Sequence, residues 1–265
     1  MKKITSRSNP VCMHIKKLAS SRGYREKHGQ FICDGIKLLE EAMNSSADIE
    51  IVMTSSDLDL ALPAKTRVYQ ADLSLLDSLS PLKNSQGVLF VCRIPSATRD
   101  NTQAYIDSFR SGTHVLLDRV QDPGNVGTII RSAHAFGINS ILLTADCADI
   151  YNPKTIRATM GAIFKQKVYY TCLDDLKSIK EAGVKFIGTS SDIGAKHPDK
   201  NDLINSIIMF GNEGQGLQDH LLDLCDDMIS IPLSENCESL NVAIAASIIM
   251  WETSKGSKKK NTRTL

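Results

Sequence analysis

Hydrophobic and polar positions alternate along the first hundred residues with the periods of short strands and amphipathic helices. The pattern predicts strands at 30–34, 49–54, 67–70 and 87–93. It predicts helices at 11–18, 36–43 and 73–79. We expect these elements to form one small α/β unit.

A different pattern begins near His114, where short apolar runs recur between amphipathic segments. The runs predict buried strands at 115–117, 141–143, 167–171, 185–188, 207–210 and 228–231. Alternation of this kind is typical of an open, mostly parallel sheet with helices on both faces. Ligands bind such sheets beyond the carboxyl ends of the strands.

Between the two patterns, apolar residues become sparse from about residue 95 to residue 112. This stretch indicates a linker or a boundary helix. We therefore expect an N-terminal domain over 1–97, a linker over 98–112 and a second domain over 113–265.

The formal net charge of +1 hides an uneven distribution. Residues 1–30 contain eight Lys or Arg and one acid, and residues 251–265 contain five Lys or Arg and one acid. The body between these basic ends is therefore acidic. Basic ends on an acidic body favour a polyanionic partner, although such runs also serve simply as solvated surface.

The composition excludes several other classes of protein. No apolar run approaches the roughly 20 residues that span a bilayer, and the N-terminus lacks the apolar core of a signal peptide. We therefore expect no membrane segment and a cytoplasmic location. The seven cysteines form no CxxC pair and accompany no cluster of histidines, so we expect reduced thiols and no bound metal.

Three segments at predicted strand ends carry polar residues that need explanation. The first, Asp122-Pro-Gly-Asn-Val-Gly, follows a strand and begins a helix that contains Asn125 and Arg131. Taken alone, Asn125 is explained as a helix cap and Arg131 as a surface cation.

The second segment, Gly211-Asn-Glu-Gly-Gln-Gly, ends the apolar run 207–210. Its spacing is G-x-x-G-x-G, which is not the dinucleotide pattern G-x-G-x-x-G. The glycines permit close backbone approach to a ligand or simply serve in turns. Glu213 between them is placed to accept hydrogen bonds or to orient a cation.

The third segment runs from Ile231 into a helix that is apolar almost all round over 242–251, and such a helix must be buried. Ser239 and Asn241 lie near its start. Capping of the helix explains the serine but leaves Asn241 unexplained.

Together the segments resemble the SpoU/TrmH-type RNA 2'-O-ribose methyltransferases of the SPOUT superfamily. The resemblance extends to 152–154 and 157–164, and residues 6–10, 31–35 and 38–42 look like the family's N-terminal substrate-binding domain. It covers about 4–45 and 113–252. Three positions depart from the usual pattern: Asp34, Thr159 and Glu235. None of them is a proposed catalytic group, although Glu235 adds a charge to the segment expected to hold the cofactor.

The resemblance implies a C-terminal domain threaded as a trefoil knot, an exception to the general absence of knots. It implies S-adenosyl-L-methionine as cofactor, held largely by backbone at positions matching Gly211, Ile231 and Leu240. Family members are homodimers with the active site near the interface, so we expect a homodimer. The apolar helix 242–251 supplies either interface and core or core alone.

The reaction that the resemblance implies is attack of a ribose 2'-oxygen on the sulfonium methyl group. The polar residues matching the family's site are Asn125, Arg131, Glu213, Ser239 and Asn241. Arg131 is the family's usual candidate for removing the proton, yet a guanidinium normally stays charged. We therefore favour a role for Arg131 in holding a phosphate or stabilising the emerging alkoxide, while the other four position it, the ribose and the cofactor.

Several functional alternatives stay open at this point. The separate N-terminal domain favours ribosomal RNA as the substrate, with transfer RNA as the alternative. A non-catalytic RNA-binding protein of the same fold would suit the basic ends but would lack the polar residues that are present here. A nucleotide-dependent oxidoreductase would need the missing G-x-G-x-x-G motif.

Overall fold

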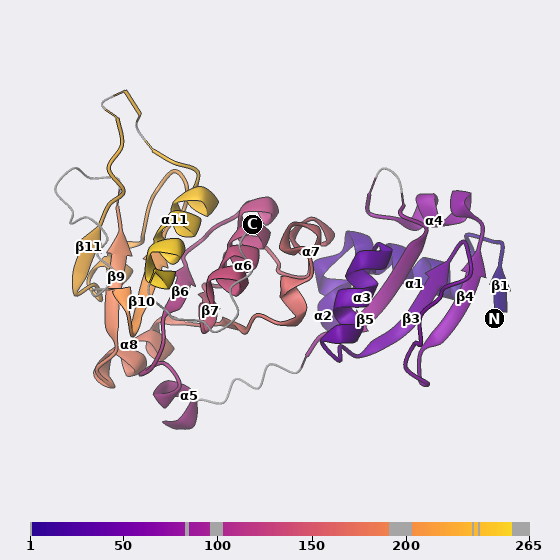
Figure 1. Cartoon of the computed structure of the whole chain (residues 1–265), viewed down its shortest axis with the longest axis horizontal. Coiled ribbons are helices and arrows are strands. Elements are labelled where there is room, and N and C mark those ends of the chain that lie inside the picture. Colours follow the sequence, from indigo (N-terminus) through magenta and orange to yellow (C-terminus); the bar gives the residue numbers. More distant parts are fainter. Residues whose placement is uncertain are drawn as a thin grey trace. The chain divides into compact units, whose positions relative to one another are not determined.

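The structure is a computed structural model that describes residues 2–82, 85–95, 103–190, 203–234, 236–237 and 239–255. The chain divides into two compact units. The first comprises Met1–Thr98 with Ala148–Lys165, and the second comprises Arg99–Cys147 with Gln166–Leu265. Each unit is described by itself (Figure 1).

The first unit is built on a five-stranded sheet with the order β1-β4-β3-β5-β2. Its strands are β1 (Lys2–Ile4), β2 (Gln30–Asp34), β3 (Ile49–Thr54), β4 (Arg67–Ala71) and β5 (Val88–Arg93). The pairs β1–β4 and β3–β4 are parallel, whereas β5 runs antiparallel to β2 and β3. Its helices over 2–95 are α1 (Pro10–Ser20), α2 (Arg22–His28), α3 (Ile36–Asn44) and α4 (Leu73–Leu79).

Alternation along the strands gives this sheet two apolar faces. One face, which includes Ile32 and Val91, packs against α1 and α4. The other face, which includes Phe31 and Phe90, packs against α3. Successive side chains of a strand point to opposite faces of the sheet, so the same strands contribute apolar side chains to both cores.

A segment from the middle of the chain completes the second of these cores. It contains α7 (Pro153–Thr159) and the 3-10 turn η1 (Ala162–Phe164), and Ile156 is buried among the residues of that core. Just before α7, Asp149 accepts a hydrogen bond of 2.6 Å from Nη2 of Arg25, and both side chains are almost fully buried. Residues 148–165 therefore belong to the first compact unit. The domain boundaries expected from the sequence stay a prediction.

The second unit contains a six-stranded sheet with the order β11-β9-β10-β6-β7-β8, in which every pairing is parallel. The strands are β6 (His114–Leu117), β7 (Ser140–Leu143), β8 (Val168–Tyr170), β9 (Lys185–Thr189), β10 (Ser206–Phe210) and β11 (Asp227–Ile229). The described helices are α5 (Gln103–Asp107), α6 (Pro123–Phe136), α8 (Leu173–Glu181), α10 (Asp219–Leu222) and α11 (Val242–Ser254). The predicted α/β fold with a mostly parallel sheet is confirmed.

Helices flank this sheet in two layers. Phe109, which follows α5, and Leu176 of α8 pack against one face of the strands. Helices α6 and α11 lie side by side (Figure 1), and Oγ of Ser132 lies 2.8 Å from Oγ of Ser247 between them. No helix within the described ranges is long and apolar enough to cross a membrane.

One titratable side chain is enclosed within the second unit. His114 begins β6, with Nδ1 2.7 Å from Oγ of Ser140 and Nε2 3.2 Å from the carbonyl oxygen of Ser111. Burial lowers the pKa of His114 below its usual range. All seven cysteines are free, in agreement with the predicted thiols.

Candidate functional site

The three segments singled out in the sequence follow strands that end at the same edge of the sheet. Leu117, the last residue of β6, pairs with Phe210, the last residue of β10. The first and second segments therefore leave the sheet side by side. Strand β11, which precedes the third segment, pairs in parallel with β9 next to β10.

The first segment begins α6, and its cap is Asp122 rather than Asn125. The Asp122 side chain accepts a 2.8 Å hydrogen bond from the backbone N–H of Asn125, and Pro123 occupies the first helical position. The explanation of Asn125 as a cap is therefore wrong. Because Asp122 satisfies the helix terminus, the Asn125 amide is available for other partners.

The second segment is a tight turn in which Asn212 and Gly216 form an isolated β-bridge. A Cβ atom at Gly211 would lie 2.1 Å from the carbonyl carbon of Gly216, so the close approach of the two backbone segments requires glycine there. Gly216 has φ of +67°, which glycine adopts without steric cost. Glu213 lies at the exposed tip of the turn.

The third segment ends at Asn241, which caps α11. Its side-chain oxygen accepts hydrogen bonds from the backbone N–H groups of Ala243 and Ile244, at 2.9 and 3.3 Å. The expectation that capping explains Ser239 and not Asn241 is thus reversed. Residue Glu235, the departure noted in this segment, lies outside the described residues.

Hydrogen bonds join the three segments into one polar chain. Nδ2 of Asn125 donates to Oε1 of Glu213 at 2.8 Å. Nδ2 of Asn241 donates to Oδ1 of Asn125 at 3.0 Å. Asn125 thus uses both ends of its amide, and the structure brings Glu213, Asn125 and Asn241 together as one unit.

Beside this chain lies a cavity of about 470 Å³. Five of the predicted site residues line it: Gly211, Glu213, Ile231, Ser239 and Leu240. Its walls also include Phe210 and apolar residues of α11, such as Val242. Such a volume, with apolar walls and a few polar groups, is typical of a site for a small organic molecule.

Arg131 is joined neither to the cavity nor to the polar chain. It lies on α6 six residues after Asn125, and its side chain is exposed. Within the described part of the chain, no residue forms a hydrogen bond or ion pair with Arg131. Its guanidinium is therefore accessible to a molecule that approaches α6 from outside.

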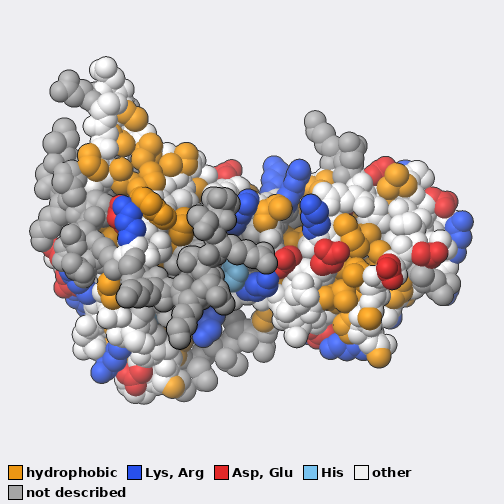
Figure 2. Space-filling view, viewed as in Figure 1, with side chains coloured by type: hydrophobic (Ala, Val, Ile, Leu, Met, Phe, Trp, Pro, Cys, Tyr) orange, Lys and Arg blue, Asp and Glu red, His pale blue; other side chains and the backbone are white. Residues whose placement is uncertain are grey.

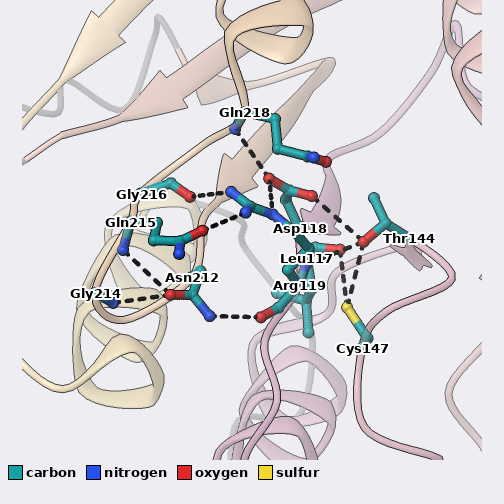
Figure 3. A network of polar contacts seen from close by, with 10 residues as sticks. All are labelled: Leu117, Asp118, Arg119, Thr144, Cys147, Asn212, Gly214, Gln215, Gly216 and Gln218. Carbon is teal, nitrogen blue, oxygen red and sulfur yellow. Dashed lines mark hydrogen bonds and ion pairs between the residues drawn. The ribbon is translucent and has the colours of Figure 1, made fainter.

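Two residues outside the predicted set, Asp118 and Arg119, directly follow β6 and hold the glycine turn (Figure 3). Arg119 forms hydrogen bonds with Asn212, Gln215 and Gly216, and Asp118 accepts one from the backbone N–H of Gln218. A charged pair directly after a buried parallel strand was the available signal. It was ambiguous because exposed turns often carry the same residue types.

A larger cavity, of about 560 Å³, lies in the first unit. Its lining includes Phe31, Tyr151 and Phe164, and it contains none of the predicted site residues. Size alone therefore does not identify the functional site, and the polar chain does. Among the described residues, no group of three or more His, Cys, Asp or Glu could hold a metal ion.

Comparison with known proteins shows the family. Residues 112–251 match the SpoU rRNA Methylase family, and residues 1–89 match the MRM3-like substrate binding domain. The chain is 30% identical to the 23S rRNA (guanosine(2553)-2'-O)-methyltransferase RlmP of Bacillus subtilis over 95% of this chain and 98% of that protein. It is 26% identical to a 23S rRNA (uridine(2479)-2'-O)-methyltransferase of Streptomyces viridochromogenes over 95% and 91% of the two chains.

Solved structures show the same similarity. The AdoMet-bound rRNA methyltransferase from Sinorhizobium meliloti superimposes with a TM-score of 0.83 at 27% identity, over 96% of this chain and 97% of that one. The SpoU methyltransferase AviRb from Streptomyces viridochromogenes, in complex with AdoMet, gives 0.76 at 26% identity over 93% and 97%. The resemblance inferred from the motifs is thereby confirmed.

Proposed function

The chain belongs to the SpoU rRNA methylase family, and from that premise we propose that it transfers the methyl group of S-adenosylmethionine to a ribose 2'-hydroxyl in ribosomal RNA. The observation that carries the proposal is the hydrogen-bonded chain Glu213–Asn125–Asn241, of which Glu213 lines the 470 Å³ cavity. A purely RNA-binding protein has no need of such a constellation beside a cavity of this size.

The cavity residues fit the cofactor. Backbone groups at Gly211 and apolar side chains of Ile231 and Leu240 would hold it, since they line a space of the right size for an adenosyl group. When bound, S-adenosylmethionine supplies an electrophilic sulfonium methyl group. We further propose that the second and third segments are threaded as the family's trefoil knot.

The polar residues of this chain orient the attacking ribose. Asn125 holds the carboxylate of Glu213 by one hydrogen bond and is itself held by a second from Asn241, and Ser239 lies on the cavity wall. Holding two reactants in line lowers the barrier by removing orientational freedom in advance. We assign Arg131 the stabilisation of the emerging alkoxide or of an adjacent phosphate, because a guanidinium stays protonated and is a poor base.

The first unit is proposed to bind the RNA, since residues 1–89 match a substrate binding domain. Lys16, Lys17, Arg22 and Lys27 are exposed on α1 and α2. Cations of this kind attract the phosphate backbone without reading its sequence. We propose ribosomal RNA as the partner and the cytoplasm as the location.

We also propose a homodimer formed through α11. Ile244 and Trp251 are 53% and 49% exposed and lie two helical turns apart, on one face of the helix. Hydrophobic side chains gather around this helix in Figure 2. Contiguous exposed apolar patches mark interaction surfaces.

Gel filtration tests the dimer. We expect the mass of two chains at micromolar concentration and the mass of one chain after Ile244→Glu. Leu73→Glu provides the matched control, since Leu73 is 50% exposed in the first unit. A wild-type protein that elutes as one chain would contradict the dimer.

Incubation with methyl-labelled cofactor tests the function. We expect label in ribosomal RNA at a ribose 2'-oxygen, and roughly a hundredfold loss of transfer or more in Arg131→Ala with cofactor binding retained. Arg110→Ala is the control, because that arginine pairs with Asp107 at the end of α5. Label in transfer RNA alone would reassign the substrate, and no label in any RNA would refute the methyltransferase.

A further inference from the structure

Asp118, the first residue after β6, carries a carboxylate that is completely buried. The carboxylate has three partners (Figure 3). Its Oδ2 accepts from the backbone N–H of Gln218 at 3.0 Å and from Nε of Arg119 at 3.4 Å, and its Oδ1 accepts from Oγ1 of Thr144 at 3.4 Å. A buried charge is stable only when it is paired in this way, so Asp118 fixes the guanidinium of Arg119.

Arg119 extends from that anchor to the glycine turn. Its Nη1 donates to Oε1 of Gln215 at 2.6 Å, and its Nη2 donates to the carbonyl oxygen of Gly216 at 3.2 Å. In return, Nδ2 of Asn212 donates to the backbone oxygen of Arg119 at 3.0 Å. Arg119 therefore contacts the turn through its side chain, at Gln215 and Gly216, and through its backbone, at Asn212.

The backbone at Arg119 is adapted to this task. Its φ of +53° lies in the left-handed region that non-glycine residues rarely adopt. The backbone N–H of Arg119 donates to Oγ1 of Thr144 at 3.0 Å, which holds the turn after β6 in place. An unusual backbone conformation that is held by its surroundings is a feature of functional sites.

The turn that Arg119 holds is the wall of the cofactor cavity. Residues 211–217 all line the cavity, whereas Arg119 does not. Glu213 at the tip of the same turn accepts the hydrogen bond of Asn125. A shift of the turn would therefore change the cavity wall and move the Glu213 carboxylate away from Asn125.

We propose that Arg119 is a positioning residue for methyl transfer: anchored by Asp118, it holds turn 211–217 in the conformation that binds the cofactor and presents Glu213. The inference rests on the proposed methyltransferase function. It predicts a selective effect, because the turn lines the cofactor cavity and not the basic surface of α1 and α2. Loss of Arg119 raises the KM for S-adenosylmethionine and leaves the KM for RNA unchanged.

Three substitutions distinguish the role of the Arg119 side chain from the effect of its backbone conformation. Arg119→Gly removes the guanidinium but adopts the positive φ without steric cost, so it tests the side chain in a folded protein. Arg119→Ala removes the same group without that relief. Arg119→Lys keeps the charge but cannot donate to Gln215, Gly216 and Asp118 in the arrangement of a planar fork.

The assay is steady-state transfer with labelled S-adenosylmethionine, together with calorimetric titration of the cofactor into the full-length protein. We expect the KM and Kd for the cofactor to rise about tenfold in all three variants, which corresponds to about 1.4 kcal/mol. Circular dichroism at the assay temperature verifies folding, and Arg110→Ala provides an arginine control in the same unit.

The outcomes distinguish the two proposals. Active wild-type protein with cofactor KM unchanged in Arg119→Gly overturns the role of Arg119 and leaves the methyltransferase intact. Equal loss for the cofactor and the RNA, or a lower melting temperature with unchanged KM, shows that Arg119 is merely structural. A wild type that neither binds cofactor nor labels RNA overturns the proposed function and the role of Arg119 with it.

Discussion

The amide of Asn125 is the centre of the polar chain, and replacing it by Asp tests that arrangement with almost no change in shape. In the wild type, Nδ2 of Asn125 donates to Oε1 of Glu213 at 2.8 Å, and Oδ1 accepts from Asn241. Asn125→Asp retains the acceptor for Asn241. It replaces the donor facing Glu213 by a second carboxylate oxygen.

The magnitude follows from these two changes. A hydrogen bond to a charged group contributes about 1.5–3 kcal/mol, and the exposed position of Glu213 places this one near the lower end. Two like charges about 4 Å apart repel by about 1 kcal/mol in a water-like environment. The combined cost of about 2.5 kcal/mol corresponds to roughly a 60-fold loss of kcat/KM, since 1.4 kcal/mol is tenfold.

The assay compares Asn125→Asp with Asn125→Ala, which loses the hydrogen bond but introduces no charge. At neutral pH we expect Asn125→Asp to be about fivefold less active than Asn125→Ala, the equivalent of about 1 kcal/mol. Added salt screens this repulsion, so it should narrow the gap in activity between Asn125→Asp and Asn125→Ala.

Two results would refute this reasoning. If Asn125→Asp is as active as wild type at neutral pH, the Asn125–Glu213 hydrogen bond has no part in transfer. If the gap in activity between Asn125→Asp and Asn125→Ala does not change with added salt, the extra loss has another cause than the facing carboxylates.

Three further predictions concern backbone packing, a buried ion pair and pH. Gly211→Ala should weaken cofactor binding at least tenfold in calorimetry, because its Cβ would lie 2.1 Å from the carbonyl carbon of Gly216. Asp149→Asn should lower the free energy of unfolding by about 3–5 kcal/mol in urea titrations, since it leaves Arg25 buried without its counter-charge. Burial lowers the pKa of His114, so below about pH 6.5 the unfolded chain binds a proton that the native protein resists. Stability should therefore fall as the pH drops below about 6.5, and His114→Gln should remove that component.

Matched substitutions control for general effects in the first two cases. Gly23→Ala places a Cβ with no heavy atom within 4 Å and should leave cofactor binding unchanged. Asp72→Asn breaks an exposed ion pair with Lys3 and should change stability by less than about 1 kcal/mol. A cost for Asp149→Asn no larger than for Asp72→Asn would contradict the buried-pair argument. A pH profile identical in His114→Gln and wild type would contradict the histidine assignment.

The strands were predicted to within two residues because burial imposes a strict pattern on them. Two elements of the first unit, one strand and one helix, escaped prediction for physical reasons. Strand β1 spans only Lys2–Ile4, with Ile4 alone buried, so it has no pattern to detect. Helix α2 is polar and contributes one buried residue, Arg25, whose burial depends on Asp149 more than a hundred positions away.

The candidate site was predictable where side chains act locally and in order along the chain. The resemblance identified Asn125, Glu213 and Asn241, and the structure joins them by hydrogen bonds. The division between capping and site residues was not predictable. Asp122 and Asn241 are the caps because of the backbone conformation at the two helix starts, which depends on how each chain segment leaves the sheet.

Two arginines on either side of Asn125 show what decides such a role. Arg119 and Arg131 are the same residue type twelve positions apart, yet one is 18% exposed in its side chain and is committed to the glycine turn, while the other is exposed. Residue 119 reaches the turn because Leu117 pairs with Phe210, so the chain segments after β6 and β10 leave the sheet together. Strand order, which brings together residues nearly a hundred positions apart, therefore brings Arg119 to the glycine turn and leaves Arg131 exposed on α6.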